Sequence, residues 1–329
     1  MISRRILLAR AGYALIPTPL VVHAQTPGKV YRLGVFDYGP VSPKHPNAVA
    51  YFDELRRRGY AQGQNLVVLR RDAGSQLDRL GEIAREVVSW KPDVITASSS
   101  GANLALKAVT TSIPIVMTGV GDPVGVGLVA SLARPGGNFT GITAVAGNQF
   151  SAKALQLLHE AVPRAKVIGV FINPDNPGNR MLLSPLMAAA QHLSIDLRVF
   201  EVRAPQEVQA AIEAALREPC QAVYVPGDPV LNAPALGLGQ RATDAALPLM
   251  SLLRLQVEAG GLMSYGPNFP DLYRRAAMQT DRLFRGERPA EMPIEQPTRF
   301  ELVINRKTAR TLGLTISQAL LLQADEVLH

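Results

Sequence analysis

The chain has 329 residues, of which 47% are hydrophobic and 19% are charged. This length suits two globular domains, and the composition excludes a disordered chain that lacks a core. The net charge of +7 is not concentrated in a block of Lys and Arg with interleaved aromatic residues, so we predict no nucleic-acid partner.

The start of the chain has the pattern of an export signal. A basic beginning precedes the mostly apolar run 6–22, and Val22-His23-Ala24 places small residues where a signal peptidase cleaves. We therefore predict a signal peptide over residues 1–24, with cleavage before Gln25. The arginine pair near the start is also typical of twin-arginine export, and an ordinary Sec signal is the alternative.

Strands and helices are predicted to alternate from residue 31 onward. Apolar runs and helical spacing predict short strands at 33–36, 66–69, 93–96 and 115–117, and helices at about 47–58, 77–88 and 100–110. A glycine-rich segment follows the fourth strand. We expect it to contain a short apolar helix that ends at Arg134, followed by a second short strand that ends at Thr143.

Three serines and a glycine open the helix that follows the third strand, at Ser98, Ser99, Ser100 and Gly101. Hydroxyl groups and backbone N–H groups at a helix N-terminus can hydrogen-bond a carboxylate. The simpler interpretation is that one serine caps the helix, which accounts for one of the three. We favour a ligand-binding role for this loop.

The same alternation restarts after Thr143. Strands are predicted at 167–172, 197–202, 222–225, 249–252 and 261–265, with helices at about 149–161, 181–193 and 208–216. Strands that are apolar on both faces and alternate with helices are typical of parallel sheets covered by helices. The predicted fold class is therefore α/β.

Two similar loops follow predicted strands, Gly121-Asp122-Pro123 and Gly227-Asp228-Pro229. Loops at the carboxyl ends of strands in two equivalent α/β units would face each other across a cleft. The alternative is that each Asp only caps a helix in which Pro takes the first position.

Motifs for enzyme chemistry are absent from the sequence. It contains no P-loop, no complete dinucleotide fingerprint, no G-x-S-x-G and no H-E-x-x-H. The internal histidines are scattered, and Cys220 is the single cysteine. We therefore predict no catalytic residues, no metal site and no cofactor.

Four sequence stretches together resemble the ABC-transporter substrate-binding proteins of the tryptophan/tyrosine-type group. They are Val120-Gly-Asp-Pro-Val124 with Gly127-Leu-Val129, Ser131-Leu-Ala-Arg-Pro-Gly-Gly-Asn138, Glu258-Ala-Gly-Gly-Leu-Met-Ser-Tyr-Gly-Pro-Asn268 and Glu295-Gln-Pro-Thr-Arg-Phe-Glu-Leu-Val-Ile-Asn305. The resemblance covers nearly the whole mature chain. It implies the type I periplasmic-binding-protein fold, with two Rossmann-like lobes joined by a three-crossing hinge.

The resemblance also implies how the chain is divided between the lobes. Lobe 1 would hold residues 30–143 plus 264–296, and lobe 2 would hold residues 144–263 plus 297–329. Gly141 and Gly266, at the first two crossings, are the hinge candidates.

Ligand-binding residues are expected where strands end at the cleft. From the two lobes and the second crossing we select Tyr38, Ser99, Ser100, Asp122, Asn173, Asn176, Asp228 and Tyr265. Tyr265 either stacks on the ligand or packs the hinge, and the turn 173–179 has turn chemistry as its alternative. Asp37, Asp122 or Asp228 would pair with the ammonium group of an amino acid.

The resemblance implies a periplasmic, monomeric receptor that binds a small organic ligand and delivers it to an inner-membrane ABC permease. The ligand would be an amino acid or a related carboxylate. A ligand-sensing receptor that docks on a membrane sensor is the second hypothesis. An exported α/β enzyme is the third.

Overall fold

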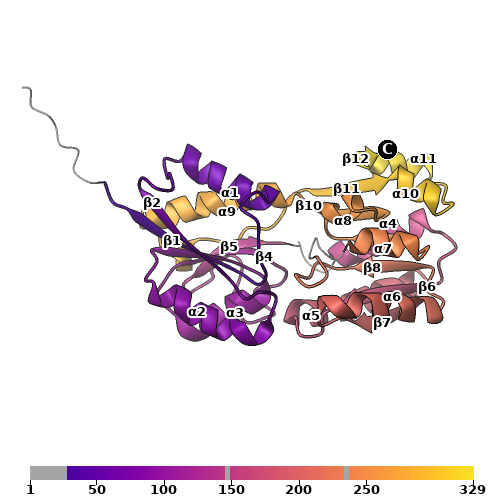
Figure 1. The fold of residues 1–329 in the computed structure, drawn as a ribbon, viewed down its shortest axis with the longest axis horizontal. Helices are drawn as coiled ribbons and strands as arrows, with labels where there is room; N and C mark the ends of the chain where they lie inside the picture. The colour runs from indigo at the N-terminus through magenta and orange to yellow at the C-terminus, as the bar shows by residue number, and fades with distance from the viewer. Residues whose placement is uncertain (1–27, 145–148, 233–236) are drawn as a thin grey trace, which may run out of the picture.

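The computed structural model describes residues 28–144, 149–232 and 237–329 and folds into two lobes side by side (Figure 1). The predicted signal peptide and its cleavage site before Gln25 lie outside these residues. Among the described helices, none has the length and apolar character needed to cross a membrane.

The first lobe is built on a five-stranded parallel sheet with the order β2-β1-β3-β4-β5. Its strands are β1 (Tyr31–Asp37), β2 (Leu66–Asp72), β3 (Val94–Ser98), β4 (Ile115–Val120) and β5 (Phe139–Thr143). One face is covered by α1 (Pro46–Arg57) and α9 (Phe269–Phe284), and the other by α2 (Leu80–Ser89) and α3 (Ser100–Val109). Helix α9 comes late in the chain yet packs beside α1 (Figure 1).

The second lobe is built on a seven-stranded sheet with the order β12-β11-β10-β9-β8-β6-β7, parallel except between β10 and β11. Its strands are β6 (Val167–Ile172), β7 (Asp196–Glu201), β8 (Ala222–Val225), β9 (Leu249–Ser251), β10 (Met263–Pro267), β11 (Phe300–Asn305) and β12 (Glu326–Leu328). Its helices are α4 (Gln149–Ala161), α5 (Pro177–His192), α6 (Val208–Arg217), α7 (Leu238–Asp244), α8 (Arg254–Glu258), α10 (Arg306–Thr311) and α11 (Gln318–Gln323).

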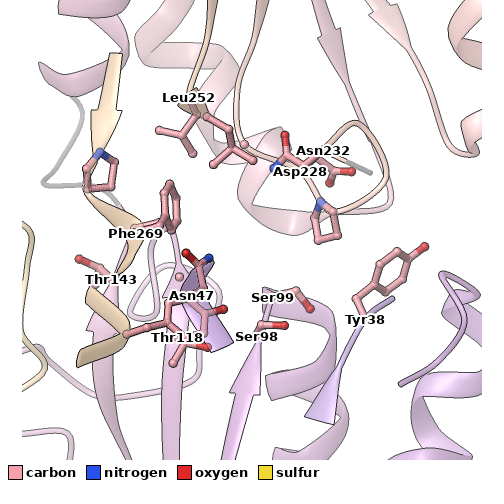
Figure 2. A pocket seen from close by; sticks show the side chains of 18 of the residues that line it. Tyr38, Asn47, Ser98, Ser99, Thr118, Thr143, Asp228, Asn232, Leu252 and Phe269 are labelled. Atoms are coloured by element: carbon pink, nitrogen blue, oxygen red, sulfur yellow. The ribbon is translucent and has the colours of Figure 1, made fainter. Parts of the chain in front are cut away.

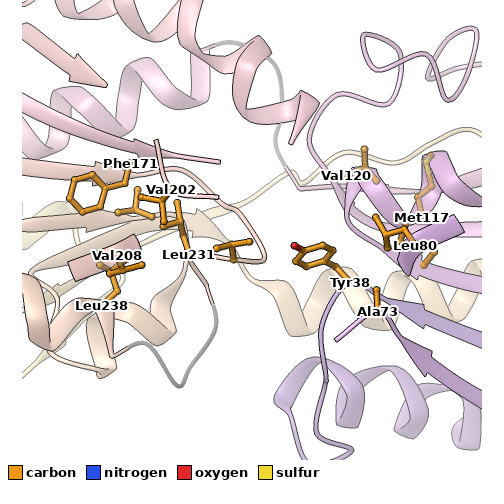
Figure 3. Close-up of a cluster of buried hydrophobic side chains, with 14 of the residues drawn as sticks. Tyr38, Ala73, Leu80, Met117, Val120, Phe171, Val202, Val208, Leu231 and Leu238 are labelled. Carbon is orange, nitrogen blue, oxygen red and sulfur yellow. The ribbon is translucent and has the colours of Figure 1, made fainter. Parts of the chain in front are cut away.

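Aliphatic side chains fill most of each core, as the low aromatic content predicts. In the second lobe, Leu155, Leu186 and Met250 are fully or almost fully buried on the face covered by α4 and α5. Complete burial of a side chain of this size stabilises the fold by roughly 1.5–3 kcal/mol. A continuous apolar cluster also extends from one lobe toward the other, where Tyr38 faces Leu231 (Figure 3).

Most elements lie where the apolar periodicity predicts them, but one predicted helix is absent and the second crossing lies later than the resemblance implies. The predicted helix before Arg134 is instead a series of turns, because Gly127 adopts φ +74° and interrupts the helical turn that begins at Asp122. The residues assigned to the second crossing, 264–266, are strand residues of β10 that pair with β9 and β11. The chain therefore leaves the second sheet only after Pro267.

The two glycines taken as hinge candidates stand inside paired strands. A Cβ atom at Gly141 would clash with the backbone of Met117, and one at Gly266 would clash with the carbonyl oxygen of Leu252. Gly141 also adopts φ +138°, which a side chain disfavours. Close approach of backbones thus explains both glycines.

Candidate ligand-binding cleft

A cavity of about 1410 Å³ lies between the two lobes and is lined by residues of both (Figure 2). The first lobe contributes the carboxyl ends of β1, β3 and β4 and the N-termini of α1 and α3. The second lobe contributes the N-terminus of α5 and the loops after β8 and β9. Strand ends of parallel sheets are the usual location of ligand sites in α/β folds.

Six of the eight selected residues line this cavity, namely Tyr38, Ser99, Ser100, Asp122, Asn176 and Asp228. Asn173 and Tyr265 are not among the described residues that line it. Asn173 is buried, its Oδ1 accepts a hydrogen bond from the backbone of Asp175, and a hydrogen bond from its side chain lowers the pKa of Asp228. Tyr265 stacks on Phe150 with ring centroids 5.3 Å apart and packs against the apolar core of the second lobe.

The serine loop is held in a strained conformation. Ser99 has φ +70°, and its Oγ accepts a hydrogen bond from the Ala102 N–H, so it is the helix cap. Ser98 donates its hydroxyl proton to Asp37 at 2.6 Å. The buried amide of Asn103 donates to the carbonyl oxygen of Ser99 and fixes the loop from behind. Ser100 lies opposite Gly178 of α5. A Cβ atom placed on Gly178 would lie 3.6 Å from the Oγ of Ser100.

The two Gly-Asp-Pro loops have different environments. Asp122 is exposed, and its carboxylate accepts a hydrogen bond from the Gly125 N–H, so it caps a turn where a helix was predicted. Asp228 is 1% exposed and accepts hydrogen bonds from Asn176, Asn179 and the backbone of Val230. Burial raises the pKa of Asp228, while the hydrogen bonds from Asn176 and from the backbone of Val230 act in the opposite direction.

Two amide oxygens beside Asp228 are buried without a hydrogen-bond partner in the described part of the chain, Oδ1 of Asn179 and Oδ1 of Asn232. Both residues line the cavity. The amide of Asn179 has a defined orientation, because only its Nδ2 can donate to the carboxylate of Asp228. Its Oδ1 therefore points the other way. A buried acceptor without a donor indicates a ligand or water that supplies one. Asn232 carried no signal in the sequence.

Part of the cavity continues under α1 into the first lobe. We call this part the α1 pocket, and it is lined by Val35, Asp37, Tyr51, Phe52, Arg70, Thr96 and Tyr273. Burial raises the pKa of Asp37 to about 6, although the hydrogen bond from Ser98 and the charge of Arg70 lower it. Arg70 carries no signal in the sequence, because it lies within a strand whose alternation resembles that of any edge strand.

The raised pKa of Asp37 makes a pH-dependent contribution to stability. The folded protein retains this proton between about pH 4 and about pH 6, where the unfolded chain releases it, so stability falls as the pH rises through this window. We expect Asp37→Asn to stabilise the protein by about 1–2 kcal/mol more at about pH 7.5 than at about pH 4. Thermal unfolding of both proteins at both pH values measures this difference. An equal difference at the two pH values would contradict it.

The lobes contact each other at the edge of the cleft. Met181 of α5 approaches Gly125 so closely that a Cβ there would clash with its methyl group. Tyr38 and Leu231 are both buried where the lobes meet (Figure 3). Burial, with the charges of Asp228 and Asp175, raises the pKa of Tyr38 to about 12. The cleft is therefore closed along this edge.

No three His, Cys, Asp or Glu side chains come close enough to hold a metal ion within residues 28–144, 149–232 and 237–329.

A two-lobed α/β protein with a cavity shared by the lobes is the architecture of a solute-binding protein. A family model described as ABC transporter substrate binding protein matches residues 49–328. The chain belongs to this family, which consists of binding proteins rather than enzymes.

Known relatives agree with this assignment. The chain is 27% identical over 264 residues to the Tyrosine-binding protein of Clostridioides difficile (strain R20291), covering 80% of this chain and 75% of that protein. A conserved domain protein from Vibrio cholerae is 28% identical with a TM-score of 0.85, covering 91% of this chain and all of that one. An ABC domain from Streptococcus pneumonia in complex with L-Trp is 22% identical with a TM-score of 0.84, and the match again covers 91% of this chain and all of that one. The predicted type I periplasmic-binding fold is confirmed.

Proposed function

We propose that this protein is exported, captures an amino acid or a related small carboxylate between its lobes, and delivers it as a monomer to an inner-membrane ABC permease. The signal peptide would be removed before Gln25, and no chemical step takes place on the ligand. One observation carries the proposal. The cavity sets hydrogen-bond donors of one lobe opposite unpartnered acceptors of the other.

The donors belong to the N-terminus of α3. The first backbone N–H groups of a helix have no partner within the helix, and here these are the N–H groups of Ser100 and Gly101. The hydroxyl of Ser100 lies beside them. This group suits the carboxylate of the ligand, because the helix dipole also favours negative charge there.

The acceptors belong to the second lobe. The amide oxygens of Asn179 and Asn232 have no protein donor among the described residues, and the carboxylate of Asp228 lies directly behind them. An ammonium group supplies three N–H donors and a positive charge. Relatives with a tyrosine-binding name and with bound L-Trp support an amino acid as the ligand.

Binding and closure would then be one process. The carboxylate and the ammonium group of an amino acid are attached to the same carbon atom, so both lobes reach their groups only when the cleft is closed. The ligand therefore shifts the equilibrium toward the closed form by its difference in affinity for the two forms. We propose residues 30–143 with 268–296 as one rigid body and residues 144–267 with 297–329 as the other.

The carboxylate site is tested with the double variant Ser99→Ala/Ser100→Ala. We expect its affinity for the bound amino acid to fall by about 10- to 100-fold, because the Ser100 hydroxyl no longer donates to the carboxylate and the Ser99 cap that orders the N-terminus of α3 is lost. Isothermal titration calorimetry measures this change. Tyramine, which lacks the carboxylate of tyrosine, should bind the wild-type and double-variant proteins equally weakly.

Ser317→Ala is the matched control for the serine experiment. Ser317 caps α11 through the Leu320 N–H, far from the cleft, so its removal costs a cap of similar strength. The affinity of Ser317→Ala for the amino acid should equal that of the wild type. Unchanged binding by the double variant would disprove the carboxylate site.

A further inference from the structure

The α1 pocket has aromatic walls and ends in a polar pair. Tyr51 and Phe52 of α1 and Tyr273 of α9 pack in the apolar cluster on this face of the first sheet. Val35, Arg70 and Thr96 are partners in register on three neighbouring strands, so their side chains emerge on the same face. A planar side chain that enters from the cleft would lie against these rings.

Arg70 is the cation of the pocket, and its donors are unused. Its guanidinium lies 4.1 Å from the centre of the Phe52 ring, which orients the group. It forms no hydrogen bond and no ion pair within 4.0 Å in the part of the chain that the structure describes. The next residue, Arg71, extends from the opposite face of the strand and pairs with Glu86 at 2.5 Å. A partly buried guanidinium with five free N–H groups needs an acceptor.

Asp37 supplies the opposite sign in the same pocket. Its Oδ1 accepts the Ser98 hydroxyl proton, and its Oδ2 has no hydrogen bond among the described residues. Because the two charges balance, a charged ligand group attracted to one of them is repelled by the other. A neutral group that accepts from Arg70 and donates to Asp37 satisfies both.

We propose that the α1 pocket recognises a phenolic hydroxyl at the end of an aromatic ligand side chain, with Arg70 as donor and Asp37 as acceptor. This proposal rests on the proposed function, since it assigns the side chain of the captured amino acid. A phenol O–H both donates and accepts a hydrogen bond, and its ring suits the walls of Tyr51, Phe52 and Tyr273. Arg70 is thereby the residue that sets specificity.

The test compares L-tyrosine with L-phenylalanine by isothermal titration calorimetry of the purified protein. The wild type should bind L-tyrosine at least about 10-fold more tightly, because L-phenylalanine leaves the buried polar pair without partners. Arg70→Met should lower the affinity for L-tyrosine by about 10-fold or more and change that for L-phenylalanine by no more than about twofold. Arg71→Met, the matched control, should change neither.

The possible results separate this proposal from the proposed function. Equal affinities of the wild type for both ligands, or an equal loss of both in Arg70→Met, would overturn the α1-pocket proposal while leaving amino-acid capture intact. Failure of both ligands alongside binding of another amino acid would do the same. If no amino acid binds, both proposals fail. The wild-type ratio needs no variant, so a misfolded variant leaves the test valid.

Discussion

Replacing Asp228 by alanine is expected to lower ligand affinity by about 100-fold or more and to destabilise the fold by about 2–4 kcal/mol. The carboxylate is 1% exposed and accepts hydrogen bonds from Asn176, Asn179 and the backbone of Val230. Its removal leaves these donors buried and unpaired. The amide of Asn179 is then free to turn, and its oxygen no longer faces the cavity.

The other Gly-Asp-Pro loop of the chain offers a matched control for this experiment. Asp122 stands in the equivalent Gly-Asp-Pro sequence, but it is exposed and accepts one hydrogen bond from the Gly125 N–H. We expect Asp122→Ala to change stability by no more than about 1 kcal/mol. Calorimetric titration and thermal unfolding of both variants provide the comparison. Similar losses of stability in the two variants would contradict the distinction between the buried Asp228, which organises the site, and Asp122, an exposed residue that caps a turn at the wall of the cavity.

Replacing Gly141 by alanine is expected to destabilise the first lobe by about 3 kcal/mol or more. A Cβ there would clash with backbone atoms of Met117 on β4, and backbone atoms cannot move aside without breaking the β4–β5 pairing. The residue also has φ +138°. Thermal unfolding should therefore show a clearly lower midpoint for the variant.

Gly137→Ala is the control for the glycine experiment. Gly137 lies shortly before the same strand, has open space around the position of a Cβ, and does not have a positive φ. We expect its unfolding midpoint to equal that of the wild type. If Gly141→Ala unfolds normally but binds ligand with altered affinity, the glycine acts as a bending point instead of a packing requirement.

The order of strands and helices follows from local patterns in the sequence. The apolar run of β6, Val167–Ile172, and the helical spacing of α2 each carry their own evidence, because burial on one or both faces determines the pattern. The end of β10 has no such local pattern in the sequence. Gly266 and Pro267 are typical of turns, and they pair as strand residues only because β11 lies beside them. Tertiary contacts decided that boundary.

The candidate site was predictable only where a residue stands at a strand end. Ser99 and Asp228 follow apolar strands directly and were found in this way. Arg70 and Asn232 had no such signal, because the first points into a pocket formed by α1 and α9 and the second depends on the path of a loop. The sequence separation between β2 and α9 is too large for any local pattern to show that Arg70 and Tyr273 share a cavity.

Calorimetric titration of the purified protein with the L-amino acids tests the central claim most directly. We predict that at least one binds with one ligand per chain and a dissociation constant of about 1 µM or lower, equivalent to about 8 kcal/mol or more. We also predict a negative heat-capacity change, since closure removes the apolar walls of the cleft from water. The absence of binding by every amino acid, with binding of an uncharged polyol or sugar instead, would contradict the account.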